Sequence, residues 1–160
     1  MRVGNGYDVH AFEAGDHLMI GGQRIAFDKG FRAHSDGDVL LHAICDALLG
    51  AAGLGDIGRH FPDTDAAWKG ADSRHLLQAV IALLHDRGLH CISLDATVVA
   101  ERPKLARHAP AIVALLAADL SLAADRINIK ATTSERMGFC GREEGIAAMA
   151  TVLLDESATR

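Results

Sequence analysis

Strand-like and helix-like patterns alternate along this chain of 160 residues. Strands are expected where apolar and polar residues alternate or β-branched residues gather, and helices where apolar residues recur at every third or fourth position. We expect strands over residues 2–11, 18–20, 23–27, 91–100, 127–132 and, with a helix as the alternative, 145–154, and helices over 39–50, 72–87 and 110–120. This order predicts an α+β fold: a single two-layer α/β domain over residues 1–160, with a mixed sheet that carries its helices on one face.

Three segments rich in turn-forming residues separate these elements. Residues 30–37 carry too many turn formers for a helix or strand, and Asp38 after them is suited to cap the helix that follows. Residues 51–71 are predicted to form a long irregular connection, and Gly138 to Gly141 a turn. A connection as long as 51–71 is usually functional or disordered.

Composition excludes several classes of protein. A net charge of −5 and only 4% aromatic residues disfavour a nucleic-acid partner, which would require a basic surface or aromatic stacking platforms. No export signal is visible in residues 1–8, and the apolar run 109–118 is too short to cross a membrane. Cys45, Cys91 and Cys140 suggest neither a disulfide framework nor a metal knuckle, so a reducing cytoplasm is expected.

Asp8 and His10 are alternate residues of a predicted strand, so their side chains point the same way and could bind one ion. His42, on the helix predicted over 39–50, is the best candidate for a third ligand, with Asp38 or Asp46 orienting its ring. Two imidazoles and one carboxylate suit zinc and leave a fourth coordination position open for substrate. The alternative is that this Asp-x-His pattern is accidental in a chain with nine histidines.

Other polar segments suggest phosphate chemistry. His34 to Asp38 precede a helix, where free amides favour an anion, although helix capping explains most of these residues. The carboxylates of residues 56–65 could bind the hydroxyls of a polyol, or could form a solvated acidic loop. Residues 130–135 suit a diphosphate with Mg²⁺ held by Glu135, although strand-end capping explains them equally well. Arg142 could bind phosphate, although a glycine turn with a solvated arginine is the commoner case.

Together these motifs closely resemble the 2-C-methyl-D-erythritol 2,4-cyclodiphosphate synthase family. The segments that carry the resemblance are Gly4–His10, His34–Ala43, Leu54–Asp65, Lys69–Ser73 and Gly141–Gly145. The resemblance implies a homotrimer whose sheets pack around a central axis and whose active sites lie between adjacent subunits. It also implies the family's reaction, in which the 2-phosphate of 4-diphosphocytidyl-2-C-methyl-D-erythritol 2-phosphate attacks the β-phosphate and releases CMP, in the non-mevalonate route to isoprenoids.

The resemblance also implies a role for each matching residue. It places Zn²⁺ on Asp8, His10 and His42, and Mg²⁺, with Mn²⁺ as a substitute, on Glu135. His34 and Thr133 resemble the residues that stabilise the transition state. The methylerythritol phosphate is expected at Ser35, Asp56, Ile57, Gly58, Phe61, Asp63 and Asp65, and the cytidine diphosphate at Ala100, Lys104, Leu105, Ala131 and Thr132. Phe139 and Arg142 resemble residues of a central trimer cavity that holds an isoprenoid diphosphate in some relatives.

Glu101 and Arg102 depart from the less charged sequence that is usual before the Pro-Lys of the family's cytidine loop. Two competing functions remain open at this point. One is a zinc-dependent phosphohydrolase, in which metal-bound water attacks phosphorus. The other is a non-catalytic trimeric module that binds a nucleotide or an isoprenoid diphosphate and regulates a neighbouring enzyme.

Overall fold

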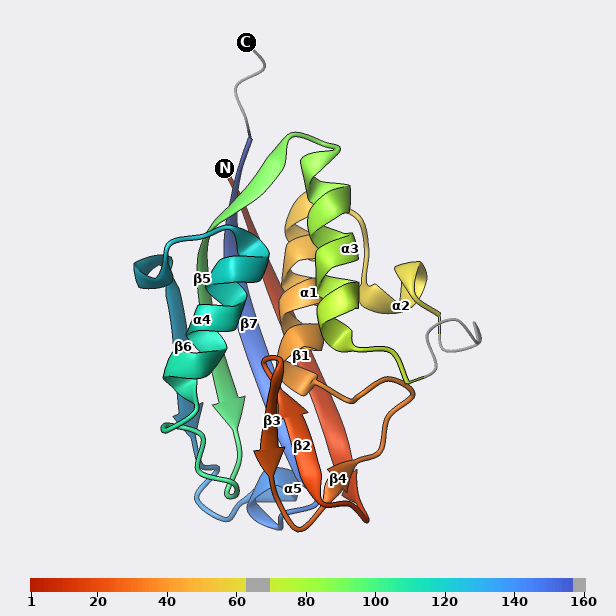
Figure 1. The fold of residues 1–160 in the computed structure, drawn as a ribbon, viewed down its shortest axis with the longest axis vertical. Coiled ribbons are helices and arrows are strands. Elements are labelled where there is room, and N and C mark those ends of the chain that lie inside the picture. Colours follow the sequence, from red (N-terminus) through yellow and green to blue (C-terminus); the bar gives the residue numbers. More distant parts are fainter. Residues whose placement is uncertain (63–69, 157–160) are drawn as a thin grey trace.

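The computed structural model describes residues 1–62 and 70–156, which form a two-layer α/β fold (Figure 1). One layer is a five-stranded mixed sheet in the order β4-β1-β7-β5-β6, in which only the β5–β6 pair is parallel. The bounds of its strands are β1 Arg2–Glu13, β4 Gly30–Phe31, β5 Leu89–Val99, β6 Ile127–Thr132 and β7 Gly145–Glu156. The expected mixed sheet is therefore confirmed.

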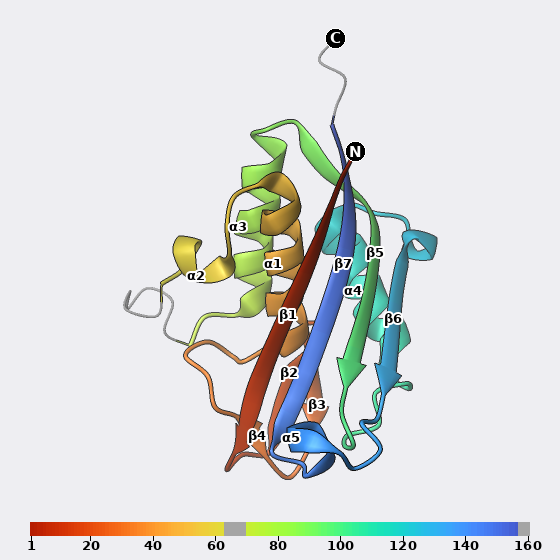
Figure 2. The ribbon, with the colours of Figure 1, turned by 180° about the vertical axis from the view of Figure 1, so that it is seen from behind.

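Three helices cover one face of this sheet and leave the other open (Figures 1 and 2). They are α1 Val39–Ala52, α3 Ser73–His85 and α4 Ala109–Leu120. Buried and exposed residues alternate along β1, because Gly4 and Gly6 face α1 while Val3, Tyr7 and Val9 face outward. Val3 is 70% exposed and Tyr7 is 54% exposed, so the open face of the sheet carries exposed apolar side chains on a single chain.

Glycines in β1 allow α1 to lie directly against the strand. A Cβ atom built on Gly4 would stand 2.0 Å from the carbonyl oxygen of Ala47, and one on Gly6 would stand 1.9 Å from that of Ala43. Any side chain at these positions would push the helix away from the sheet. The close approach also brings the first turn of α1, which carries His42, onto Asp8 and His10 of β1.

Asp38 joins α1 to a hairpin that lies on the helical side of the sheet, β2 His17–Ile20 and β3 Gln23–Ala26. Its buried carboxylate caps α1 by accepting a hydrogen bond from the backbone N–H of Leu41 (3.0 Å). The same carboxylate accepts hydrogen bonds from the N–H groups of Gly21 (2.8 Å) and Gly22 (2.7 Å) in the hairpin turn. The predicted cap is confirmed, and three backbone donors depend on one side chain.

The strands and long helices agree with the sequence prediction, and residues 145–154 belong to a strand rather than a helix. Three short elements were missed. Residues 30–31 form β4, residues 57–60 within the predicted irregular connection form α2 (Ile57–His60), and the predicted turn at 138–141 is α5 (Gly138–Gly141). The chain also has a 3₁₀ turn at Ala124–Arg126. Elements of two to four residues are too short to show a hydrophobic period.

Cys45, Cys91 and Cys140 are all free thiols, as the absence of a disulfide framework in the sequence indicated. Cys45 is fully buried in α1, and burial raises the pKa of its thiol. Within residues 1–62 and 70–156, no helix combines the length and the apolar character that crossing a membrane requires.

Candidate metal centre and its cavities

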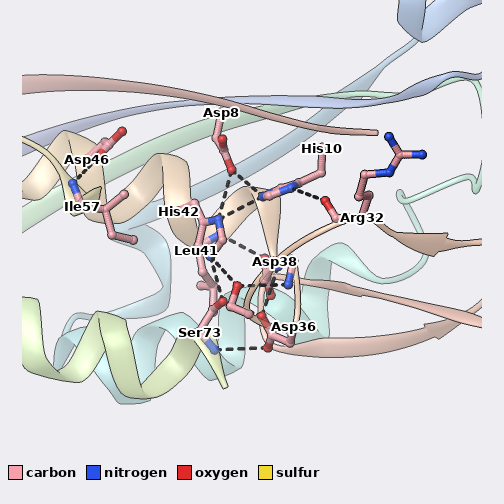
Figure 3. A network of polar contacts seen from close by, with 12 residues as sticks. Asp8, His10, Arg32, Asp36, Asp38, Leu41, His42, Asp46, Ile57 and Ser73 are labelled. Carbon is pink, nitrogen blue, oxygen red and sulfur yellow. Dashed lines mark hydrogen bonds and ion pairs between the residues drawn. The ribbon is translucent and has the colours of Figure 1, made fainter. Parts of the chain in front are cut away.

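Asp8, His10 and His42 converge on one point, as their predicted spacing indicated (Figure 3). Oδ2 of Asp8 lies 3.0 Å from Nε2 of His10 and 3.1 Å from Nδ1 of His42. The two ring nitrogens are 3.1 Å apart. The two β1 residues lie on the same side of the strand because one residue separates them, and His42 reaches them from the first turn of α1.

The ring nitrogens that face away from this point have partners of their own. Nδ1 of His10 lies 3.4 Å from the backbone oxygen of Arg32, which can accept only the Nδ1–H of that ring. Nε2 of His42 lies 3.0 Å from Oγ of Ser73 and 3.2 Å from Oγ of Ser35. When the His10 ring is neutral, its lone pair is therefore on Nε2, which faces Asp8 and His42; when the ring is protonated, its Nε2–H can donate to Asp8.

The sequence prediction that Asp38 or Asp46 orients the ring of His42 is wrong. Asp38 directs its carboxylate to the backbone N–H groups of the hairpin turn and of Leu41. Asp46 accepts a hydrogen bond from the N–H of Ile57 at 2.8 Å, and so ties α1 to α2. Both carboxylates were predicted to reach His42 because each is one helical turn away from it in the sequence. They instead accept hydrogen bonds from backbone N–H groups, which sequence spacing does not reveal.

Charge interactions within the cluster shift two pKa values. Burial raises the pKa of Asp8, but hydrogen bonds and charge interactions with His10 and His42 outweigh it and hold this pKa well below its usual range. Burial lowers the pKa of His10, but the Asp8 carboxylate and the carbonyl of Arg32 more than offset it, so the net shift is upward. A positive charge is thus stabilised where the three side chains meet.

The donor set fits a divalent metal ion. Two ring nitrogens and a carboxylate oxygen lie within 3.1 Å of one another, a separation at which lone pairs repel unless a cation or a proton lies between them. Ligands of a tetrahedral ion with bonds of about 2.0 Å are separated by about 3.3 Å, close to the distances observed. A small shift of these side chains would therefore allow three-fold ligation.

A cavity of about 500 Å³ opens beside the three side chains. Five of the residues predicted to contact substrate share its wall with the cluster; they are His34, Ser35, Ile57, Gly58 and Phe61. Asp56 instead caps α2, accepting a hydrogen bond from the N–H of Arg59 at 2.9 Å. Asp63 and Asp65 lie outside the described residues. The candidate metal ligands therefore share one cavity with four of the residues predicted to hold the methylerythritol phosphate.

A second cavity, of about 130 Å³, lies where β5 and β6 end. Every residue predicted to hold the cytidine diphosphate lines it, and Thr133 lines it too; the predicted residues are Ala100, Lys104, Leu105, Ala131 and Thr132. The parallel pairing of β5 and β6 brings residues 100–106 next to residues 131–133, because both segments leave the same edge of the sheet.

The charged residues Glu101 and Arg102 are directed away from this second cavity. Oε1 of Glu101 accepts hydrogen bonds from the N–H groups of Ser134 (3.0 Å) and Arg136 (3.1 Å). Arg102 makes ion pairs with Asp28 (3.4 Å) and Glu143 (3.5 Å). Glu101 therefore supports the loop after β6, which carries Thr133 and Glu135.

Thr133 and Glu135 contact each other, but a single chain does not bring them to the metal cluster. Oγ1 of Thr133 donates a hydrogen bond to Oε1 of Glu135 at 2.5 Å. They lie in the loop after β6, a strand that β7 and β5 separate from β1 by about 14 Å across the sheet. Among the residues that the structure describes, none lines both the first and the second cavity.

Phe139 and Arg142, the remaining predicted residues, lie near the start of β7. Phe139 lines a third cavity of about 250 Å³ with Val9, His10 and Ala11 of β1. The guanidinium of Arg142 is bound by the carboxylate of Glu144, with Nε 2.7 Å from Oε1. The predicted phosphate-gripping group thus already has an anionic partner within the chain.

Sequence reasoning missed Arg32, Leu76 and Ser73. Arg32 orients His10 through its backbone carbonyl, and Leu76 lines the first cavity with Arg32. Ser73 lies at the start of the helix predicted over 72–87, but no role in the site was predicted for it. Asp72 caps α3 through the N–H of Arg74, and the Ser73 hydroxyl contacts His42. The signal in the sequence was its place in Lys69–Ser73, a segment that carries the family resemblance.

Comparisons with known proteins agree with this arrangement. The model of the YgbB family matches residues 1–155. Two relatives are named 2-C-methyl-D-erythritol 2,4-cyclodiphosphate synthase. The protein from Chromohalobacter salexigens is 64% identical over 159 residues, which are 99% of this chain and 98% of that one. The protein from Thioalkalivibrio sulfidiphilus is 62% identical over 155 residues, which are 97% of each chain. A solved structure of a synthase of the same name, in a CDP-bound form, superposes with a TM-score of 0.89 at 41% identity, covering 96% of this chain and all of that one.

Proposed function

The chain belongs to the YgbB family of 2-C-methyl-D-erythritol 2,4-cyclodiphosphate synthases, and we propose that Asp8, His10 and His42 hold the zinc ion on which its activity depends. The enzyme is a lyase of the non-mevalonate isoprenoid pathway. It converts 4-diphosphocytidyl-2-C-methyl-D-erythritol 2-phosphate to the 2,4-cyclodiphosphate and CMP. The single observation that carries the zinc proposal is the meeting of the three side chains at the wall of the largest cavity described.

Zinc is favoured over other divalent ions by the chemistry of its ligands. Mg²⁺ and Ca²⁺ prefer sets of oxygen ligands, whereas imidazole nitrogens with one carboxylate suit zinc. Three protein ligands leave a coordination position for a substrate oxygen on the cavity side. When bound, the ion would withdraw negative charge from the β-phosphate that receives the attack.

The residues of the chain mainly position a substrate that contains both the nucleophile and the electrophile. Because the 2-phosphate attacks within its own molecule, catalysis requires a bent substrate and compensation of charge more than a strong base. Ser35, Ile57, Gly58 and Phe61 line the cavity that would hold the methylerythritol phosphate. His34 lines the same cavity and is proposed to stabilise the transition state.

The second cavity is proposed to hold the cytidine diphosphate. Lys104 supplies a cation there, and Ala100, Ala131 and Thr132 supply a narrow wall. Thr133 belongs to the same wall and contacts Glu135, which is the proposed ligand of Mg²⁺ or Mn²⁺. Glu135 is exposed on a single chain, so a bound diphosphate could supply further oxygen ligands.

A homotrimer would unite the two cavities. One chain keeps the metal cluster and the proposed nucleotide residues on different strands of the sheet. The open face of the sheet exposes Val3, Tyr7, Val9 and Met149, as expected of a surface that other subunits cover. We therefore propose three active sites, each between two neighbouring subunits, with the sheets packed around the central axis.

Two further proposals concern the surroundings of the enzyme. The cavity lined by Phe139 and Val9 is the candidate site for an isoprenoid diphosphate on the trimer axis, although Arg142 would have to leave Glu144 to bind its phosphates. The three free thiols support a cytoplasmic location, since oxidising compartments favour disulfides.

Metal analysis combined with a product assay tests the proposed site. Purified protein is expected to contain zinc, and with Mg²⁺ it should release CMP and a cyclic diphosphate. A linear phosphate that incorporates oxygen from labelled solvent would identify a phosphohydrolase instead. Binding of the substrate without turnover, in the presence of both metals, would favour the non-catalytic module.

A further inference from the structure

Ser73 and Asp36 stand behind His42, on the side of the ring that faces away from Asp8 and His10 (Figure 3). Oγ of Ser73 lies 3.0 Å from Nε2 of His42 and 2.5 Å from Oδ1 of Asp36. We infer that Asp36 and Ser73 form a positioning relay that fixes the tautomer and the orientation of His42, so that its Nδ1 lone pair faces the metal. This inference rests on the zinc site proposed above.

The direction of each hydrogen bond follows from the groups involved. An ionised carboxylate can only accept hydrogen bonds, so the single hydroxyl hydrogen of Ser73 is donated to Asp36. The oxygen of Ser73 is then an acceptor toward His42, and Nε2 must carry the ring hydrogen. A neutral imidazole carries one N–H, so Nδ1 keeps the lone pair that a metal ligand needs.

Ser35 also reaches Nε2 of His42 but cannot make this selection. Its Oγ lies 3.2 Å from Nε2 and accepts a hydrogen bond from the N–H of Gly37, also at 3.2 Å. No contact within the described part of the chain ties its hydroxyl hydrogen to a carboxylate. Ser35 could therefore donate to Nε2 or accept from it, so it leaves both tautomers of His42 open. Without Ser73, the Asp8 carboxylate 3.1 Å from Nδ1 would draw the ring hydrogen to Nδ1 in the metal-free protein.

The relay is held rigidly by the loops that carry it. Ser73 is fully buried, and its backbone N–H donates to Oδ2 of Asp36 at 3.1 Å, so both oxygens of Asp36 are engaged by the same residue. The N–H of Asp38 donates to Oδ1 of Asp36 at 3.1 Å. Two backbone hydrogen bonds also join the loops, from Asp36 N–H to Ala71 (3.1 Å) and from Gly70 N–H to His34 (2.7 Å). The relay thus links the loop that carries His34 and Ser35 to the metal ligand.

Comparison of Ser73→Ala with Ser35→Ala tests the relay, because each change removes one hydroxyl near the same nitrogen. The first readout is the ¹⁵N chemical shifts of the His42 ring in metal-free protein, which report the tautomer; the second is zinc affinity by competition with a chromogenic chelator. In Ser73→Ala we expect a mixture of tautomers and zinc affinity reduced by about 10- to 100-fold. In Ser35→Ala we expect both readouts to match the wild type.

Asp36→Asn tests the relay from its other end, because it places an amide donor within reach of the Ser73 hydroxyl. We expect the same changes as in Ser73→Ala: a mixture of His42 tautomers and a lower zinc affinity. Asp72→Ala is the control for general loosening of α3, since Asp72 caps this helix without contacting His42. A single Nε2–H tautomer with unchanged zinc affinity in folded Ser73→Ala would overturn the relay, as would equal losses in both serine variants. Failure of the zinc site itself would be recognised separately, because His42→Ala would then leave the zinc content unchanged.

Discussion

Gly6→Ala is expected to separate α1 from β1 and thereby to spread the metal ligands. The added Cβ would stand 1.9 Å from the carbonyl oxygen of Ala43 and 2.7 Å from the backbone nitrogen of Ala47. Real Cβ atoms essentially never approach another heavy atom closer than 3.0 Å, so the helix must retreat by at least about 1.1 Å. Because the obstructing atoms belong to the backbone, no side-chain rotation relieves the overlap.

The displacement has a cost in stability and a cost in function. Overpacking of a well-packed core costs typically about 1–3 kcal/mol, and a backbone obstruction places this change at the upper end of that range. His42 directly precedes Ala43, so it moves with the helix while Asp8 and His10 stay on the strand. A misplacement of about 1 Å at a reacting centre can lower the rate roughly 100-fold.

Three measurements and one control check this reasoning. Urea unfolding followed by circular dichroism gives the change in free energy of unfolding, elemental analysis gives the zinc content, and release of CMP gives kcat/KM. Gly50→Ala is the matched control in the same helix, since its Cβ would have only the Asn5 oxygen nearby, at 4.0 Å, and should stabilise the helix by roughly 0.5–1 kcal/mol. A Gly6→Ala protein with wild-type stability, zinc content and turnover would refute the argument.

Three further changes have defined outcomes. His42→Ala should abolish bound zinc and CMP release while the proposed trimer stays intact. His85→Ala, on the exposed end of α3, should leave zinc content unchanged; metal analysis and gel filtration distinguish these results. Asp38→Ala removes the acceptor of three backbone N–H groups, two of them in buried hydrogen bonds, and should lower the free energy of unfolding by about 3–5 kcal/mol, with a smaller loss for Asp38→Asn. A loss below about 1 kcal/mol in chemical denaturation would contradict this account. Glu101→Ala should loosen the loop that carries Glu135, so the Mg²⁺ dependence of turnover should move to higher concentration; an unchanged activation curve would mean that the loop holds its shape without Glu101.

The parts of the fold that sequence predicted are those with a repeating pattern. The alternation in β1 gave both the strand and the shared side of Asp8 and His10, and the apolar spacing of α1 placed His42 on a helix. The meeting of Asp8, His10 and His42 could be predicted because two periodic elements carry these residues. The contact of His42 with Asp8 and His10, however, depends on how closely α1 approaches β1. Gly4 and Gly6 allow this approach, but the sequence alone does not show that a helix packs against them.

Contacts made by the backbone could not be predicted in this way. Asp38 and Asp46 are one helical turn from His42, yet backbone N–H groups of distant segments engage their carboxylates. Ser73 directly follows the helix cap Asp72, and its hydroxyl contacts the imidazole of His42. Short polar side chains compete among several nearby partners, and tertiary structure decides which partner they reach.

The division of the proposed site between two cavities on different strands has a genetic consequence. If neighbouring subunits complete each other's sites, a chain altered only at His42 and a chain altered only at Lys104 are each inactive alone. In mixed trimers, however, some subunit interfaces would combine the intact first cavity of one chain with the intact second cavity of the other. Random equimolar mixing would restore about a quarter of the sites. Two defective alleles in one cell could therefore rescue each other, which a site contained within one polypeptide would not allow.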